Sequence, residues 1–339
     1  MKKLRMRVAS TILVLLFVAA SVPGFAVSPV LSRTLTPDRS LRFGPPVSDR
    51  VIQSFDFGSG TDVFFVQPAG ADTLLSRCSR TASGNCTQRD SVRLPGYGHG
   101  ESLEVYTENG RTYAWLGSGS GETPPFYHST TVSLVEYIKA PAGSTKASYR
   151  RVGTLTNLAA VAPGKSGPAV RSAVALADGS NRLAIRVQLG GLRSTTYYGI
   201  YNTAKLKALM KKAPGQKLSI EKAKNLLVTQ FVEPVTPNNS FQGFDINGVG
   251  TNSKNLYVFG GYSGQPPTIY RYTWTNTGLV AHVRTYVLTG PSISGVEAEG
   301  IKVEADPTSG GSIRVEVGLL PTERDSAGRR IFRLYRFAE

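Results

Sequence analysis

One pattern of short strands recurs five times along this chain. In each case a run of alternating apolar and polar residues, rich in Val, Phe, Tyr and Ile, reads as a strand by its period and residue types. The five runs are 62–66, 112–116, 182–187, 255–259 and 312–317. A large β-sandwich could also be built from such strands, but it would not require the same order of segments five times. We therefore expect an all-β chain folded as a five-bladed β-propeller.

The segments around these five runs support the same fold. A mixed polar and apolar stretch precedes each run, and a third strand commonly follows it. The preceding stretches are 51–56, 99–105, 170–175, 242–246 and 296–301. The following strands are 133–137, 197–201, 268–272 and 331–335. A repeat of this length corresponds to a four-stranded blade.

The first 26 residues have the three parts of a secretory signal peptide. Lys2, Lys3, Arg5 and Arg7 precede an apolar run over 12–20, and small residues follow up to Ala26. We expect cleavage after Ala26, with Ala20 as the alternative, and favour this interpretation over an uncleaved anchor because the apolar run is short for a bilayer span. The predicted organisation is a signal peptide over 1–26, an N-terminal extension over 27–48 and a single propeller over 49–339. We expect a secreted, extracellular protein, either free in the medium or associated with the cell wall, with no transmembrane segment in the mature chain.

The chain is strongly basic. Its formal net charge is +16, and removal of residues 1–26 lowers it to +12. Such a charge favours anionic partners, and outside a cell these are phosphate-rich wall polymers or membrane surfaces rather than nucleic acid.

The two cysteines, Cys78 and Cys86, flank what the sequence predicts to be the tip of a hairpin. In an oxidising compartment we expect them to form a structural disulfide. The tighter spacing of a redox-active motif is absent.

Residues 202–228 interrupt the strand pattern with a predicted helical insertion. Asn202 and Ser219 are placed to cap two helices, with Leu227 and Val228 late in the second. The segment contains seven lysines and one acid. One interpretation is a cationic contact with an anionic surface; the other, which we favour slightly, is a solvated insertion packed on a blade. The candidate contact residues are Lys205, Lys207, Lys211 and Lys212.

A ring of polar residues is the best candidate site. In a propeller the first strand of each blade lines the central channel, so equivalent positions in different blades converge at one mouth. The predicted ring consists of Gln53, His99, Glu101, Arg171, Gln242, Asp245, Glu297 and Glu299. Its carboxylates could bind a cation, with Ca²⁺ as the best fit, or Arg171 and His99 could face a sugar phosphate. A third interpretation, which we favour, is structural hydrogen bonding between blades.

Catalysis has little support in the sequence. The chain contains no Gly-x-Ser-x-Gly elbow, His-Glu-x-x-His helix or phosphate loop. A pair of ring carboxylates could serve a glycosidase, but any ring with several acids offers such pairs. We expect no catalytic residues and no required cofactor, and the enzymatic alternative stays open.

Five short segments of the chain match motifs of a known family; they are 99–101, 198–202, 242–246, 256–258 and 297–301. They resemble the helveticin J-type group of large bacteriocins. They also resemble the propellers of phage receptor-binding proteins and of teichoic-acid-biosynthesis-C-like proteins. The resemblance covers most of residues 50–337 and implies a five-bladed propeller. It also implies killing of related bacteria or binding of teichoic acid. The evident signal peptide departs from the general pattern of the group.

Together these observations lead us to expect a secreted, monomeric binding protein of bacteriocin type that recognises an anionic wall glycopolymer. The alternatives are a wall-polymer hydrolase or lyase using Glu101, Glu297 or Glu299, and a non-catalytic interaction propeller of the producer's own envelope.

Overall fold

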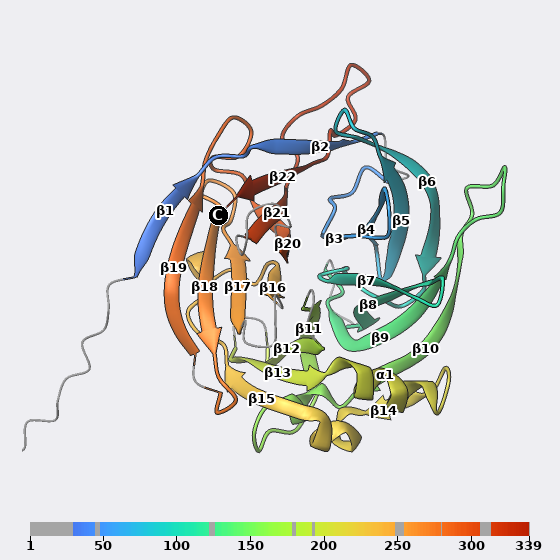
Figure 1. Ribbon diagram of the computed structural model, residues 1–339, viewed down its shortest axis with the longest axis vertical. Helices are drawn as coiled ribbons and strands as arrows, with labels where there is room; N and C mark the ends of the chain where they lie inside the picture. Colours follow the sequence, from blue (N-terminus) through green and yellow to red (C-terminus); the bar gives the residue numbers. More distant parts are fainter. Residues whose placement is uncertain are drawn as a thin grey trace, which may run out of the picture.

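Five antiparallel blades surround a central axis in the computed structural model (Figure 1). The structure describes residues 30–44, 48–121, 126–177, 181–191, 194–247, 254–278, 280–305 and 313–338. Within this part of the chain each blade has four strands in an antiparallel order, which confirms the predicted fold class. The predicted signal peptide lies outside the described residues. No helix in the described ranges combines the length and the apolar character needed to cross a membrane.

The strands follow one another around the ring in chain order. Blade 1 contains β3 (Ser54–Phe57), β4 (Asp62–Ala69), β5 (Asp72–Arg80) and β6 (Asn85–Leu94). Blade 2 contains β7 (Leu103–Glu108), β8 (Arg111–Ser120), β9 (Ser129–Ile138) and β10 (Ser148–Thr156). Blade 3 contains β11 (Ala169–Leu176), β12 (Arg182–Leu189), β13 (Thr196–Asn202) and β15 (Leu227–Val232). Blade 4 contains β16 (Phe244–Asn247), β17 (Asn255–Gly260), β18 (Thr268–Trp274) and β19 (Val280–Leu288). Blade 5 contains β20 (Ala298–Ala305), β21 (Ile313–Leu319), β22 (Arg333–Ala338) and β2 (Arg39–Phe43).

The N-terminal segment closes the ring. Strand β2 pairs antiparallel with β22 and parallel with β6, so it is the outer strand of blade 5 and also joins that blade to blade 1. Strand β1 (Leu31–Leu35) pairs in parallel with β19 of blade 4. Both strands lie within the segment 27–48 that was expected as an N-terminal extension, so the sheets of the propeller include residues before 49.

The apolar core lies between the blades. The buried residues form five clusters, and each cluster joins two neighbouring blades. Between blades 2 and 3, for example, Trp115 packs with Ile185. Each strand has two faces, and each face contacts either a neighbouring blade or the polar surface. This arrangement explains the alternation of apolar and polar residues along the strands.

The hairpin of β5 and β6 carries the predicted disulfide. Cys78 and Cys86 are bonded, with their Cα atoms 5.5 Å apart. Both cysteines are buried in the cluster between blades 5 and 1, next to Phe65. The disulfide prediction is confirmed.

The helical insertion is partly as expected. Helix α1 (Thr203–Lys211) begins at Asn202, whose side chain accepts a hydrogen bond from the Lys205 backbone N–H. After the short strand β14 (Lys217–Ser219), Ser219 caps the 3₁₀ helix η2 (Ile220–Leu226). Leu227 and Val228 do not continue this helix, because they begin β15 and complete blade 3. Two further 3₁₀ turns are η1 (Leu158–Val161) and η3 (Pro237–Asn239).

Candidate functional site

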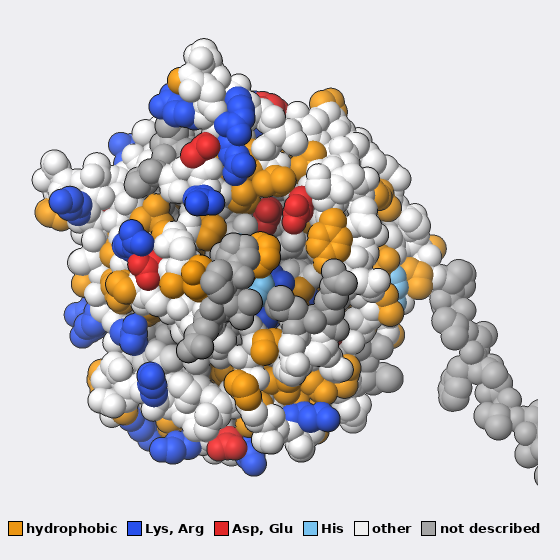
Figure 2. All heavy atoms as spheres, turned by 180° about the vertical axis from the view of Figure 1, so that it is seen from behind, with side chains coloured by type: hydrophobic (Ala, Val, Ile, Leu, Met, Phe, Trp, Pro, Cys, Tyr) orange, Lys and Arg blue, Asp and Glu red, His pale blue; other side chains and the backbone are white. Residues whose placement is uncertain are grey.

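The first strands of the blades place polar side chains at two levels of the channel. The level at which these strands begin contains His99, Glu101, His128 and Arg171, and we call it the histidine mouth. The other level contains Asp56, Glu104, Asp245 and Lys302, and we call it the lysine cluster. Several pairs, such as Glu101 and Glu104, are three residues apart, which is about 10 Å along a strand. In Figure 2, histidine, basic and acidic side chains gather near the middle of the face turned away from the viewer of Figure 1.

Glu101 is the centre of the histidine mouth. Its carboxylate accepts hydrogen bonds from Arg171 Nε at 2.7 Å, His128 Nδ1 at 2.5 Å and the Ser129 N–H at 3.3 Å. Burial opposes ionisation, but Arg171 and His128 outweigh it and lower the pKa of Glu101 to about 2. The carboxylate is therefore ionised and saturated with donors at neutral pH, so it is poorly suited to donate or accept a proton.

The two histidines lie against each other beside Glu101. The rings of His99 and His128 are 5.6 Å apart, and Phe126 stacks on His128 at 5.6 Å. Burial lowers the pKa of His99, so this ring is neutral at pH 7. The sequence predicted His99 but not His128, because His128 precedes the third strand of its blade rather than the first. No signal in the sequence places it at the channel.

Arg171 faces a second arginine across one aromatic ring. The guanidinium carbons of Arg171 and Arg186 lie 4.1 Å and 3.5 Å from the centroid of the Phe241 ring. Arg186 is fully buried and donates from Nε to Glu233 at 2.6 Å. Each guanidinium has a carboxylate partner, so both are held in fixed positions without a ligand.

Glu297 and Glu299 form the acidic side of the mouth. Full burial, followed by the neighbouring Glu297, raises the pKa of Glu299 well above its usual range, and Gln53 hydrogen-bonds its side chain. Burial also raises the pKa of Glu297, which accepts a hydrogen bond from Gln242 Nε2 at 3.2 Å. The structure thus brings these predicted ring residues together as carboxyl–amide pairs, and burial favours the protonated form of Glu299.

Asp245 does not belong to the mouth ring predicted from the sequence. Its carboxylate accepts hydrogen bonds from the N–H groups of Val303 and Ile246, both at 2.7 Å, at the level of the lysine cluster. Asp56 of blade 1 makes the equivalent contact with blade 2, because its carboxylate accepts a hydrogen bond from the Val105 N–H at 2.5 Å. These aspartates tie their first strands to the first strand of the next blade, which is the structural role that the sequence analysis favoured for the ring.

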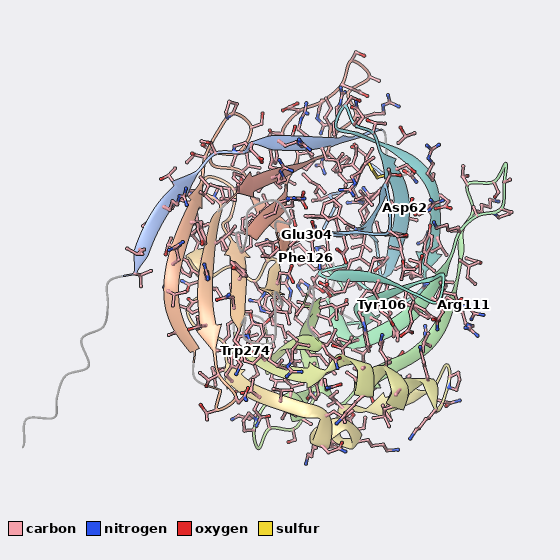
Figure 3. The ribbon with its side chains drawn as sticks, in the orientation of Figure 1. Asp62, Tyr106, Arg111, Phe126, Trp274 and Glu304 are labelled. Carbon is pink, nitrogen blue, oxygen red and sulfur yellow. A yellow bond between two sulfur atoms is a disulfide. The ribbon has the colours of Figure 1, made fainter. Side chains whose placement is uncertain are left out.

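Lys302 supplies the positive charge of the lysine cluster. Its ammonium group contacts Glu104 directly and lies 3.9 Å from Asp56. Burial raises the pKa values of Glu104 and Asp245, the latter to about 7, while the surrounding carboxylates raise the pKa of Lys302. A cavity of about 280 Å³ opens beside the cluster and is also lined by Glu304. In Figure 3, Glu304 and Phe126 both lie close to the axis, although they belong to opposite levels of the channel.

No metal site accompanies these acids. Among the described residues, no group of three or more His, Cys, Asp or Glu side chains is arranged to hold a metal ion. We therefore carry the Ca²⁺ interpretation of the ring no further.

A larger cavity lies next to the histidine mouth, between blades 3 and 4. Its volume is about 450 Å³, and it shares Phe241 with the pair of arginines. Hydroxyl and amide groups line it together with two aromatic rings. The lining residues are Gln188, Ser194, Thr196, Glu233, Thr236, Asn239, Ser240, Phe241 and Tyr262. The carboxylate of Glu233 is paired with the buried Arg186. The Ser240 hydroxyl is buried and has no hydrogen-bond partner among the described residues. Planar rings combined with hydroxyl, amide and carboxylate groups are suited to a sugar or polyol.

The lysines of the insertion divide into two groups. Lys207 and Lys211 contact Glu108 at 3.0 and 2.5 Å and lie over the rings of Tyr106 and Tyr113. These two residues fasten α1 to blade 2. Lys205 and Lys212 are exposed. The insertion is thus packed on a blade and also presents part of its charge to solvent.

Comparison with known proteins adds no assignment of function. No family model matches the chain, and no curated protein matches it. Among solved structures, it is similar to a candidate 6-phosphogluconolactonase from Bacteroides fragilis, at 12% identity and a TM-score of 0.33, over 84% of this chain and 70% of that one. A protein from Lactobacillus plantarum matches at 14% identity and a TM-score of 0.36, over 85% and 71%. A GH43 β-1,3-galactosidase with galactodeoxynojirimycin matches at 11% and 0.41, over 82% and 92%. Such low values carry no argument about activity, and none of these matches supports the helveticin-type resemblance.

The raised pKa of Glu299 predicts how stability depends on pH. A carboxyl whose pKa is raised by folding contributes stability that is present below its unfolded pKa and is lost as the pH rises through its folded pKa. We expect Glu299→Gln to leave stability at pH 5 nearly unchanged and to become more stable than the wild type as the pH rises to 9. The relative gain should exceed about 1.4 kcal/mol, the equivalent of one pKa unit. Urea unfolding at pH 5, 7 and 9 measures it, with Glu221→Gln on the exposed part of η2 as control. Parallel pH profiles for wild type and Glu299→Gln would contradict a raised pKa of Glu299.

Proposed function

We propose that this propeller is a secreted binding protein for an anionic cell-wall glycopolymer such as teichoic acid. The observation that carries the proposal is the cavity between blades 3 and 4, with the Phe241 and Tyr262 rings beside hydroxyl and amide groups. Pockets that combine aromatic faces with a few polar groups are typical of small-ligand recognition. The sugar or polyol unit of the polymer would occupy this cavity.

The charge of the chain supports an anionic polymer rather than a neutral one. The formal net charge is +16 for the whole sequence. The insertion presents Lys205 and Lys212 to solvent on the outside of the ring. Long-range attraction between such a surface and a polyanion speeds association and weakens as salt is added. The extracellular location is proposed on the signal-peptide pattern, and killing of related bacteria on the family resemblance.

Hydrolysis is the second candidate, and one specific feature favours it. Glu297 and Glu299 are neighbouring carboxyl groups with raised pKa values at the channel mouth. A protonated carboxylic acid beside a second carboxyl group is the arrangement that glycoside hydrolysis uses. Glu101 is the weakest of the three acids considered from the sequence, because its donors hold it ionised.

Retention on purified walls tests the binding proposal. Protein comprising residues 27–339 is incubated with Gram-positive cell walls, either intact or stripped of teichoic acid, and the supernatant is assayed for released fragments. We expect retention on intact walls, loss of retention on stripped walls and no fragments. Tyr262→Ala should weaken retention about three- to tenfold, the usual value of one aromatic contact.

The control is Ile138→Ala, which removes an exposed apolar side chain from blade 2. Equal retention of Tyr262→Ala and Ile138→Ala would remove the cavity from the proposal. Equal retention on stripped walls would overturn the choice of teichoic acid. Released sugar or phosphate fragments would favour the hydrolase, and Glu299→Gln should then abolish their release.

A further inference from the structure

Another cavity lies between blades 5 and 1, on the face opposite the histidine mouth. Its volume is about 410 Å³. It includes residues of the β3–β4 turn and of the β5–β6 turn, which lie at the ends of the blades away from the mouth. Four arginines line it, and we call it the arginine groove. They are Arg39 of β2, Arg80 of β5, Arg314 of β21 and Arg336 of β22.

The strand register assembles these arginines in one place. Arg39 and Arg336 are direct partners across β2 and β22, and Glu316 is the partner of Arg336 across β21 and β22. Arg80 comes from the other side of the groove, at the end of β5 in blade 1. Because β2 joins the two blades, the groove exists only when the ring is closed.

Several of the guanidinium groups are held in place by neighbours. Arg336 Nε donates to the Asp38 carboxylate at 3.1 Å, and Arg314 lies 3.9 Å from Glu304. Arg80 lies over the Phe57 ring at 4.9 Å from its centroid and donates to the Gly60 carbonyl at 3.2 Å. Groups positioned before binding lose less conformational entropy when a ligand arrives.

The groove carries an excess of positive charge. Within the described part of the chain, neither Arg39 nor Arg80 forms an ion pair with an acid. Glu316 is the acidic residue that lines the groove. Burial, followed by Glu304, raises the pKa of Glu316 to about 8. This carboxyl is therefore mostly protonated at pH 7 and offsets little of the arginine charge.

The shape and lining define the class of ligand. Guanidinium groups match the oxygens of a phosphoryl group in geometry and bind it through paired hydrogen bonds. The lining also has an apolar part, formed by Leu41, Phe57 and Leu334, and hydroxyl groups from Ser40, Thr61 and Thr81. We propose that the arginine groove is a binding site for the phosphoryl group of a polyol phosphate, whose carbon chain lies against the apolar residues. The site does not depend on the proposed function, because the groove and the cavity between blades 3 and 4 are on opposite faces.

Isothermal titration at pH 7 with glycerol 3-phosphate and with inorganic phosphate tests the site. We expect saturable binding of glycerol 3-phosphate, and weaker binding of inorganic phosphate because it lacks the carbon chain. Arg39→Gln combined with Arg80→Gln should reduce the affinity for glycerol 3-phosphate at least about tenfold, as expected for the loss of charge-assisted contacts. The control is Arg33→Gln combined with Arg89→Gln, which removes the same charge from exposed positions outside the groove. The control should bind as the wild type does.

Each of the other outcomes overturns part of the inference. Equal losses in the two double variants would show that net charge alone attracts the anion. Absence of saturable binding at millimolar ligand would exclude the site, and equal affinity for the two ligands would exclude the role of the apolar lining. If the double variant fails to fold, Arg39→Gln alone, at an exposed and unpaired residue, provides the measurement. A loss of glycerol 3-phosphate binding in Tyr262→Ala, with binding retained in the double arginine variant, would assign the ligand to the cavity between blades 3 and 4 and overturn the inference.

Discussion

Replacing Lys302 with methionine is expected to lower the free energy of unfolding by about 3–5 kcal/mol, the usual cost of removing one partner from a buried charge cluster. The Lys302 ammonium group is buried between Glu104, Asp56 and Asp245. Methionine fills a similar volume, so the loss comes from carboxylates left without a cation rather than from a void. Urea unfolding at pH 8 measures the effect, with Lys205→Met on the exposed face of α1 as the matched control.

A double variant separates electrostatics from packing. Glu104→Gln in the Lys302→Met background removes the carboxylate that contacts Lys302 directly. It should recover part of the lost stability, as a coupled pair requires. The loss in Lys302→Met should also be smaller at pH 5 than at pH 8, because the orphaned carboxyl groups take up protons as the pH falls. A loss below about 1 kcal/mol at both pH values would show that the cluster is hydrated and contributes little.

Replacing Arg42 with proline is expected to open the ring between blades 5 and 1, with a loss of about 3 kcal/mol or more. Strand β2 has partners on both sides, and the Arg42 N–H donates to the Gly84 carbonyl at 2.8 Å. Proline has no N–H and is poorly tolerated in a strand that pairs on both sides. Thermal unfolding measures the effect, and limited proteolysis near residue 44 should become faster.

Arg42→Ala is the matched control for this variant. It removes the same exposed side chain and keeps the backbone hydrogen bond, so it should change stability by no more than about 0.5 kcal/mol. If alanine and proline at this position have the same effect, β2 does not hold the ring closed. Glycerol 3-phosphate binding in the arginine groove should be lost together with ring closure, because Arg39 and Arg336 are paired across β2 and β22.

The strand repeat was predictable because it depends on local sequence. Segments such as 62–66 and 255–259 alternate in the same way, and each became the second strand of a blade. The disulfide followed from two cysteines on one hairpin. Helix α1 followed from the Asn202 cap. Each of these predictions uses residues that are close in sequence.

Residues far apart in sequence were harder to place. Asp245 was expected at the mouth, but three residues of strand put it about 10 Å away, next to Lys302. Lys207 and Lys211 were named as candidate contacts with an anionic surface, and Glu108 of blade 2 pairs with both of them. Partner choice of this kind depends on the register between blades.

By itself, the sequence determined the number of blades, the hairpin disulfide, the helical cap and the basic charge, because periodicity, capping and composition are local properties. Only the tertiary structure decided that β2 closes the ring, that His128 joins Glu101 and Arg171, and that four arginines meet between blades 5 and 1. These contacts join residues that are far apart in the sequence, and several of them join different blades. Their geometry is fixed by how the sheets pack around the axis, and no local pattern in the chain encodes that packing.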